Sequence, residues 1–138
     1  LINGYRISVQ WGPGNYVDKD VRYAEHDSPM NIPIWGSNTA EVLIWDRNDD
    51  TLFGIVWRGD LDPLTDEQMA TADQEDIDDH NARMAAAQAK LDAQGGHNDQ
   101  VFGYCSSDCV ARMIGCLASC GDSDPKRAIA QIYSASFK

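Results

Sequence analysis

The sequence has little positive charge to set against its acids. Its 138 residues include 11 Lys and Arg but 22 Asp and Glu, which gives a net charge of −11. A protein that binds DNA, RNA or an anionic membrane directly needs a basic surface, so this composition argues against those ligands. Plain solubility is the commonest reason for such a charge, and attraction to positively charged partners is the functional alternative.

Long hydrophobic runs and familiar catalytic signatures are also missing. Apolar runs such as residues 55–57 are far too short to span a bilayer, and no stretch has the form of a signal-peptide core. The histidines are His26, His80 and His97, each in a polar context that is typical of a surface position. No G-x-S-x-G or H-E-x-x-H motif is present. We therefore predict that the protein is not an enzyme and uses no metal or cofactor.

What is present predicts a single α+β domain. The 43% hydrophobic fraction and four Trp argue against a disordered chain. Residues 1–60 are β-rich: residues 5–11 alternate apolar and polar side chains, and residues 40–45 and 51–57 predict a hairpin around the polar sequence DRNDD. We expect a small antiparallel sheet from this segment.

The rest of the chain predicts helices. Residues 64–95 predict one long acidic helix, because Thr65 and Gln68 fit a capping box, Ala is frequent, and Gly95 and Gly96 supply a stop. Residues 106–137 predict a pair of shorter helices, the first with Val110, Met113, Ile114 and Leu117 as its core stripe. The second begins at Pro125 behind a Ser123 or Asp124 cap.

The acidic stretch is the main functional candidate. Residues 62–80 contain no Lys or Arg, and the side chains that we expect to bind a partner are Asp66, Asp73, Glu75, Asp76, Asp78 and Asp79. On one helix, Asp66, Asp73 and Asp76 would share one side, and Glu75, Asp78 and Asp79 another. A solvated face is the commoner role for such a stretch, and a surface for Arg and Lys side chains is the alternative. The sequence lacks the ligand spacing of an EF-hand calcium loop.

The cysteines and the aromatic residues leave alternatives open. Cys105, Cys109, Cys116 and Cys120 have a C-x3-C-x6-C-x3-C spacing, which favours free buried thiols over disulfides or zinc and fits a reducing compartment. Aromatic and basic side chains of the β segment could instead bind a planar anionic ligand. This set comprises Arg6, Trp11, Tyr16, Arg22, Trp35 and Arg58. The more ordinary interpretation places the Trp side chains in the core and rim of the sheet.

Residues 7–16, ISVQWGPGNY, and residues 39–46, TAEVLIWD, resemble small uncharacterised phage and prophage proteins. In those proteins a strand ends in a V-Q-aromatic-G-P-G-N/H-Y turn, and an AEVAVWD-type strand follows. The family pattern places a Cys soon after the Tyr, where this chain has Val17. The resemblance covers a small part of the chain and carries no functional residue. It implies a phage-encoded accessory protein in the cytoplasm of an infected cell.

These observations lead to a function hypothesis with two alternatives. The hypothesis is a non-enzymatic interaction protein whose acidic helix binds and inhibits a basic, nucleic-acid-handling host protein, as a DNA mimic or an anti-CRISPR protein would. The first alternative is a module that sequesters a nucleotide-like signalling ligand through the Trp and Arg side chains, and the second is a small enzyme. Self-association through the long helix or a sheet edge is compatible with each of them.

Overall fold

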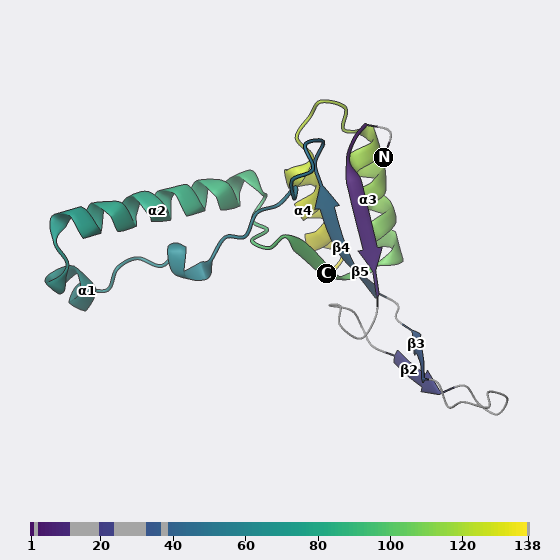
Figure 1. Ribbon diagram of the computed structural model, residues 1–138, viewed down its shortest axis with the longest axis horizontal. Helices are drawn as coiled ribbons and strands as arrows, with labels where there is room; N and C mark the ends of the chain where they lie inside the picture. Colours follow the sequence, from purple (N-terminus) through teal and green to yellow (C-terminus); the bar gives the residue numbers. More distant parts are fainter. Residues whose placement is uncertain (2, 12–19, 24–32, 37–38, 138) are drawn as a thin grey trace.

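The computed structural model describes residues 1, 3–11, 20–23, 33–36 and 39–137, and it confirms the α+β class. Figure 1 shows a globular body from which two segments project. The elements, in chain order, are β1 (Arg6–Gln10), β2 (Asp20–Tyr23), β3 (Pro33–Gly36), β4 (Thr39–Trp45), η1 (Arg58–Asp60), α1 (Asp66–Thr71), α2 (Gln74–Ala93), β5 (Val101–Ser106), α3 (Ser107–Ser119) and α4 (Lys126–Ala135). None of the helices in the described ranges is both long and apolar enough to cross a membrane.

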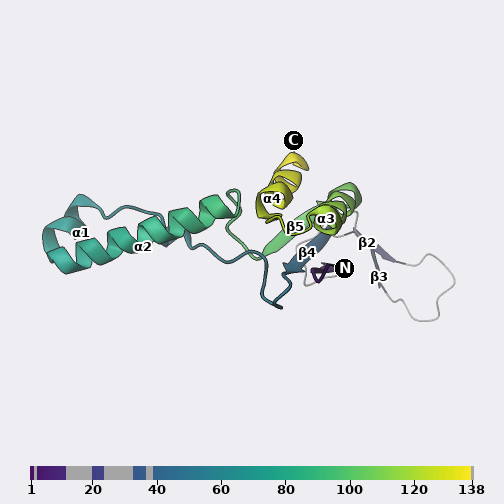
Figure 2. The ribbon, with the colours of Figure 1, turned by 90° about the horizontal axis from the view of Figure 1, so that it is seen from above.

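A three-stranded antiparallel sheet in the order β1-β4-β5 forms the centre of the body. β2 and β3 pair with each other in a separate antiparallel hairpin. Helices α3 and α4 pack on one face of the three-stranded sheet (Figure 2). The core lies in this layer, and its most deeply buried side chains are Val42, Ile44, Phe53, Phe102, Cys105, Cys109, Met113, Leu117 and Ile129.

The central strand β4 follows the period-2 pattern that the sequence predicts. Ala40, Val42 and Ile44 are buried, and the residues between them are half-exposed. Alternate side chains of a strand point to opposite faces, so one face of β4 packs against the helices and the other stays partly open to solvent. The predicted strand at residues 5–11 is also confirmed, as β1.

The partner of β4 on its other side was not predicted. The sequence predicts a hairpin strand at residues 51–57, but only Thr51 bridges to Trp45, and the Leu52 N–H donates to the Ile44 carbonyl at 2.8 Å. The chain then leaves the sheet, and β5, more than fifty residues after β4, takes the next place. Tyr104 in β5 has φ 56°, and the register with β4 shifts between Ala40 and Val42, so this strand lacks the regular pattern that identifies β1 and β4.

The predicted single helix over residues 64–95 is wrong in one respect, because it is two helices. Ala72 has extended backbone with ψ 148°, and Asp73 begins a new helix by accepting a hydrogen bond from the Asp76 N–H at 2.9 Å. Asp is a strong N-cap residue, and capping competes with helix continuation. The capping box of Thr65 and Gln68 is confirmed at the start of α1.

The C-terminal pair of helices is confirmed, with one change at the start of α4. Ser106 caps α3 by accepting from the Cys109 N–H at 3.2 Å. In α4, Pro125 is the N-cap residue rather than the first helical residue, and Asp124 accepts from the Lys126 N–H at 3.0 Å. In α3 only part of the predicted stripe is in the core: Met113 and Leu117 are fully buried, whereas Val110 and Ile114 are half-exposed.

Candidate functional site

Residues 54–96, which we call the arm, extend away from the body as two antiparallel segments (Figures 1 and 2). Residues 54–64 run outward through η1, α1 turns the chain, and α2 runs back. No residue of α2 itself is buried. Such a projection needs a firm attachment, since its own core is too thin to hold it.

Gln94 attaches the arm to the body. It lies just after α2, is 3% exposed, and is the one buried polar residue among those described. Its amide oxygen accepts from the Gly54 N–H at 2.6 Å, and its amide nitrogen donates to the carbonyls of Gly54 at 2.9 Å and His97 at 2.8 Å. One side chain therefore joins both segments of the arm to the start of the chain that leads into β5.

Further hydrogen bonds secure the same base. The Lys90 ammonium donates to the Ile55 carbonyl at 3.0 Å, and the Val56 N–H donates to the Asn98 carbonyl at 3.0 Å. A Cβ on Gly54 would lie 2.5 Å from Lys90 Cε, so only glycine allows this close approach with Lys90 in place. α2 ends where the Gly96 N–H bonds back to the Leu91 carbonyl at 2.9 Å, with Gly95 at φ 65°.

A narrow apolar seam joins the two segments along the arm. The half-buried residues of α2 are Ile77, His80, Met84, Ala87 and Leu91, spaced alternately by three and four. This spacing gives one stripe on a helix. His80, which interrupts the apolar pattern in the sequence, belongs to the stripe because its Nε2 lies 3.0 Å from the Asp62 carbonyl of the outward segment.

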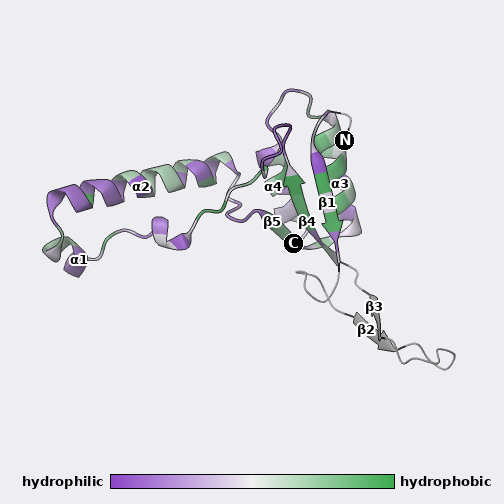
Figure 3. Ribbon diagram, viewed as in Figure 1, coloured by the Kyte–Doolittle hydropathy of each residue, from purple (hydrophilic) through white to green (hydrophobic). Residues whose placement is uncertain are grey.

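The predicted acidic residues lie on the outer half of the arm and are exposed. Asp66 is in α1, Asp73 caps α2, and the other four are in the first turns of α2: Glu75, Asp76, Asp78 and Asp79. Figure 3 shows the hydrophilic colour along the outer part of α2, in contrast to the hydrophobic strands and α3 of the body. None of the six forms an ion pair with another described residue. Arg83 has no such partner either, and Lys90 is engaged with a carbonyl.

The break in the helix changes which acids share a face. Asp66 belongs to a separate helix from Asp76, so the predicted common side of Asp66, Asp73 and Asp76 does not exist. Glu75, Asp78 and Asp79 do share a face, because at about 100° per residue they fall within roughly 100° of arc. That arc lies opposite the apolar seam and faces solvent.

A hollow at the outer end of the arm brings two of the acids together. It has a volume of about 530 Å³ and is lined by Leu64, Ala72, Asp76, Asp79, His80, Ala82 and Arg83. Its lining combines apolar side chains with two carboxylates and the guanidinium of Arg83. The apolar side chains and the carboxylates suit the methylene stem and the charged head of a long basic side chain, whereas Arg83 opposes it.

The predicted aromatic and basic ligand set is not brought together. Arg6 pairs with Asp49 and lies over the Trp45 ring, whereas Trp11 is beyond the opposite end of β1 and Arg58 is on the arm. Tyr16 lies outside the described residues, and Arg22 and Trp35 are on β2 and β3, where the structure describes the backbone alone. Trp11 and Trp57 are 63% and 67% exposed, so neither fills the core.

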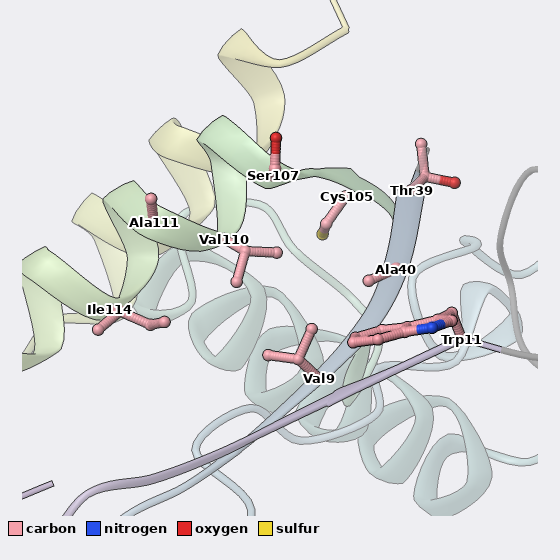
Figure 4. A pocket seen from close by; sticks show the side chains of 9 residues that line it. All are labelled: Val9, Trp11, Thr39, Ala40, Cys105, Ser107, Val110, Ala111 and Ile114. Carbon is pink, nitrogen blue, oxygen red and sulfur yellow. The ribbon is translucent and has the colours of Figure 1, made fainter. Parts of the chain in front are cut away.

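A second candidate is an apolar pocket that sequence reasoning missed. It has a volume of about 330 Å³ and lies between the end of β1 and α3 (Figure 4). Its walls are Val9, Trp11, Thr39, Ala40, Cys105, Ser107, Val110, Ala111 and Ile114. The sequence predicts Val110 and Ile114 as part of the apolar stripe of a helix. Such a stripe does not show which of its residues the sheet covers and which are left to line a pocket.

The four cysteines are free thiols, and the pocket reaches one of them. Burial, together with the nearby Cys109 thiol, raises the pKa of Cys105 far above its ordinary value. Burial also raises the pKa of Cys116. Because the thiolate is the nucleophile, these protonated thiols are suited to packing rather than to catalysis.

Of the two described histidines, His97 packs among aromatic rings and is half-buried, so the prediction of a surface position is wrong for it. Its ring stacks on Phe102 with centroids 4.0 Å apart and meets Phe53 and Tyr133 edge-on. Burial lowers the pKa of His97, and Asp99 and a hydrogen bond to the Val101 backbone partly oppose this. Its Nε2 is buried without a partner among the described residues. The half-buried ring therefore packs at the edge of the core, against Phe53 and Phe102.

Comparison of the chain with protein-family models, with curated proteins and with solved structures yields no match.

Proposed function

We propose that this is a non-enzymatic interaction protein whose acidic arm binds a basic surface on a nucleic-acid-handling protein and blocks that surface. The observation that carries the proposal is the placement of the acids. Glu75, Asp78 and Asp79 form an exposed anionic face opposite the seam that holds the arm together, and none of them forms an ion pair with a described base. The resemblance of residues 7–16 and 39–46 to phage proteins points to a host protein as the target.

The shape of the arm supports the same proposal. A helix of 20 residues spans about 30 Å, long enough to lie along a groove that otherwise binds a nucleic acid backbone. Like charges on one helix face repel each other by a few tenths of a kcal/mol per pair, and a basic partner would remove that cost. The hollow beside Asp76 and Asp79 offers a place for one basic side chain of the partner.

Coulomb's law gives the expected loss of binding free energy when acids of the arm are replaced by lysine. A carboxylate about 5 Å from a partner's ammonium group in water contributes about 0.8 kcal/mol, and reversal of the carboxylate changes this by about twice as much. Two reversals therefore weaken binding by about two orders of magnitude at low salt and by less at physiological salt, because ions screen exposed charges.

The test compares two variants with the same change in net charge. Glu75→Lys/Asp79→Lys reverses two acids of the anionic face, neither of which accepts a hydrogen bond from a described residue. Asp50→Lys/Asp108→Lys reverses two exposed acids of the body, and Asp108, like Glu75, is in the first turn of a helix. Each variant and the parent protein are used to capture proteins from a bacterial lysate, with elution by rising salt.

We expect a nucleic-acid-binding protein that the parent and the Asp50/Asp108 variant retain and the Glu75/Asp79 variant loses. The purified partner should then lose its nucleic acid binding when the parent protein is added. Equal weakening of capture in both variants, relative to the parent, would show that net charge alone attracts the partner and would refute a role for the arm. Retention of the same partner by all three proteins would refute the proposal.

A further inference from the structure

Among the described strands, β1 is an edge of the three-stranded sheet, on the side away from the arm (Figure 1). β1 pairs with β4 alone among the described strands. The hydrogen bonds of β4 show which groups of β1 point outward. The Ile44 carbonyl accepts from the Leu52 N–H, so the main-chain N–H and C=O groups of Ile44 point away from β1. The residues of β4 whose main-chain groups bond to β1 are therefore its neighbours Leu43 and Trp45.

The main-chain groups at this edge belong to Ile7 and Val9. Leu43 pairs with Ser8 and Trp45 with Arg6, so the N–H and C=O groups of Ile7 and Val9 lie on the outer side of β1. No described residue bonds to them. An edge with free donors and acceptors is a template for another strand, and proteins that do not use such an edge protect it with charges, proline or a covering element.

The apolar pocket lies beside this same edge. The side chains of Ile7 and Val9 turn toward the helix layer, and Val9 faces the pocket opposite Val110 and Ile114 of α3 (Figure 4). Directly paired residues of adjacent strands place their side chains on the same face of the sheet. A residue paired with Val9 on an added strand would therefore insert its side chain between β1 and α3.

We propose that the groove between β1 and α3 binds an extended peptide segment of a partner protein, which adds to the sheet as a fourth strand. The N–H and C=O groups of Ile7 and Val9, to which no described residue bonds, pair with its main chain, and the pocket takes an apolar side chain at the position opposite Val9. In this mode of peptide recognition, the addition of a strand to a sheet edge, main-chain hydrogen bonds supply affinity and pockets for alternate side chains supply specificity.

Charge selects the occupant. A second copy would bring a net charge of −11 against −11, whereas a peptide with Lys at its outward positions is attracted. The solvent-facing side of β1 carries Arg6, Ser8 and Gln10, and Arg6 is already paired with Asp49. The attraction of Lys therefore comes from the net charge of the whole protein and not from an acid of β1. The occupant is therefore a basic segment with apolar residues at every second position.

The experiment uses an array of acetylated peptides of about seven residues, the length of an ordinary strand. Lys alternates with one of Ala, Val, Leu, Ile, Phe or Trp, and the full-length protein is the ligand. The tightest peptide is remade with N-methyl groups on its apolar residues, which block main-chain donation. Ala111→Trp fills the pocket from an exposed position of α3, and Ala135→Trp on α4 is the matched control.

We expect binding that N-methylation or Ala111→Trp weakens by at least about tenfold, since a buried apolar side chain is lost from the pocket. Ala135→Trp should have no effect, and the amides of Ile7 and Val9 should exchange at least about tenfold more slowly in the complex. The Glu75→Lys/Asp79→Lys variant should bind the peptide as the parent does, which separates this site from the arm.

Three results would overturn the proposal. One is that no peptide of the array binds. Another is that binding survives N-methylation and Ala111→Trp, or is lost with Glu75→Lys/Asp79→Lys, because the lysines would then be binding the arm. The last is a dimer in solution whose Ile7 and Val9 amides are already protected, which would make a second copy the occupant.

Discussion

Removal of the Gln94 side chain tests how the arm is attached. In the Gln94→Ala variant the two backbone groups of Gly54 and the carbonyl of His97 lose their partners. A hydrogen bond contributes about 1 kcal/mol net, and the loss of a partner for a buried group costs about 1–3 kcal/mol. Because Gln94 is 3% exposed and water can reach the vacated space only in part, we expect a destabilisation of about 3 kcal/mol.

Two further variants separate the hydrogen bonds from the loss of a side chain. Gln94→Glu keeps an acceptor for the Gly54 N–H but cannot donate to the two carbonyls when it is ionised. It should be at least as destabilising as alanine at neutral pH and recover stability at low pH. Gln88→Ala removes an exposed hydrogen bond to Asp92 on the same helix and should change stability by less than about 0.5 kcal/mol.

The assay combines urea unfolding with hydrogen exchange of single amides. Because α2 has no buried residue, part of the destabilisation by Gln94→Ala should appear as local opening of the arm rather than as global unfolding. The Gly54 and Val56 amides, which bond across the base, should exchange fastest relative to the parent. A Gln94→Ala protein with unchanged stability and unchanged exchange at these amides would refute this account of the attachment.

Three other perturbations follow from particular contacts. Burial holds the pKa of His97 below its ordinary value of 6.5, so the folded state binds fewer protons than the unfolded state. Stability should be complete above 6.5 and fall as the pH drops toward the folded pKa, and urea unfolding of the parent and of His97→Phe checks whether this slope disappears in the variant. Thr65→Ala removes the capping box of α1 and should cost about 1 kcal/mol, seen as faster exchange at the Gln68 amide with no change in the body. Met113→Ala creates a cavity at a fully buried position and should lower the free energy of unfolding by about 2–5 kcal/mol, and a smaller loss would mean that α3 packs more loosely than the structure indicates.

Local signals in the sequence were sufficient for much of the fold. The alternation around Val9 and Val42, the capping residues Thr65 and Ser106, and the Gly95 stop each act over a few residues. These interactions are made within one strand, turn or helix end, so they can be read from the chain without knowledge of its neighbours. The exposed acids of the arm belong to the same class of prediction.

Other features depended on contacts between distant residues. β5 joins β4 across the whole length of the arm, and Gln94 is buried because Gly54, forty residues away, lies against it. His97 has polar neighbours in the sequence but aromatic ones in space. Burial of a polar side chain depends on which elements meet around it, and no local pattern records that.

The division between the two kinds of information is clearest at the two candidate sites. The sequence alone determined that an acidic, helical stretch exists, because charge and helix propensity are properties of the residues themselves. The tertiary structure decided that this stretch stands away from the body and that Asp66 lies on a different helix from Asp76. It also decided that Val9 and Ile114, more than a hundred residues apart, enclose one pocket, because the sheet and the helix layer meet only after long-range packing.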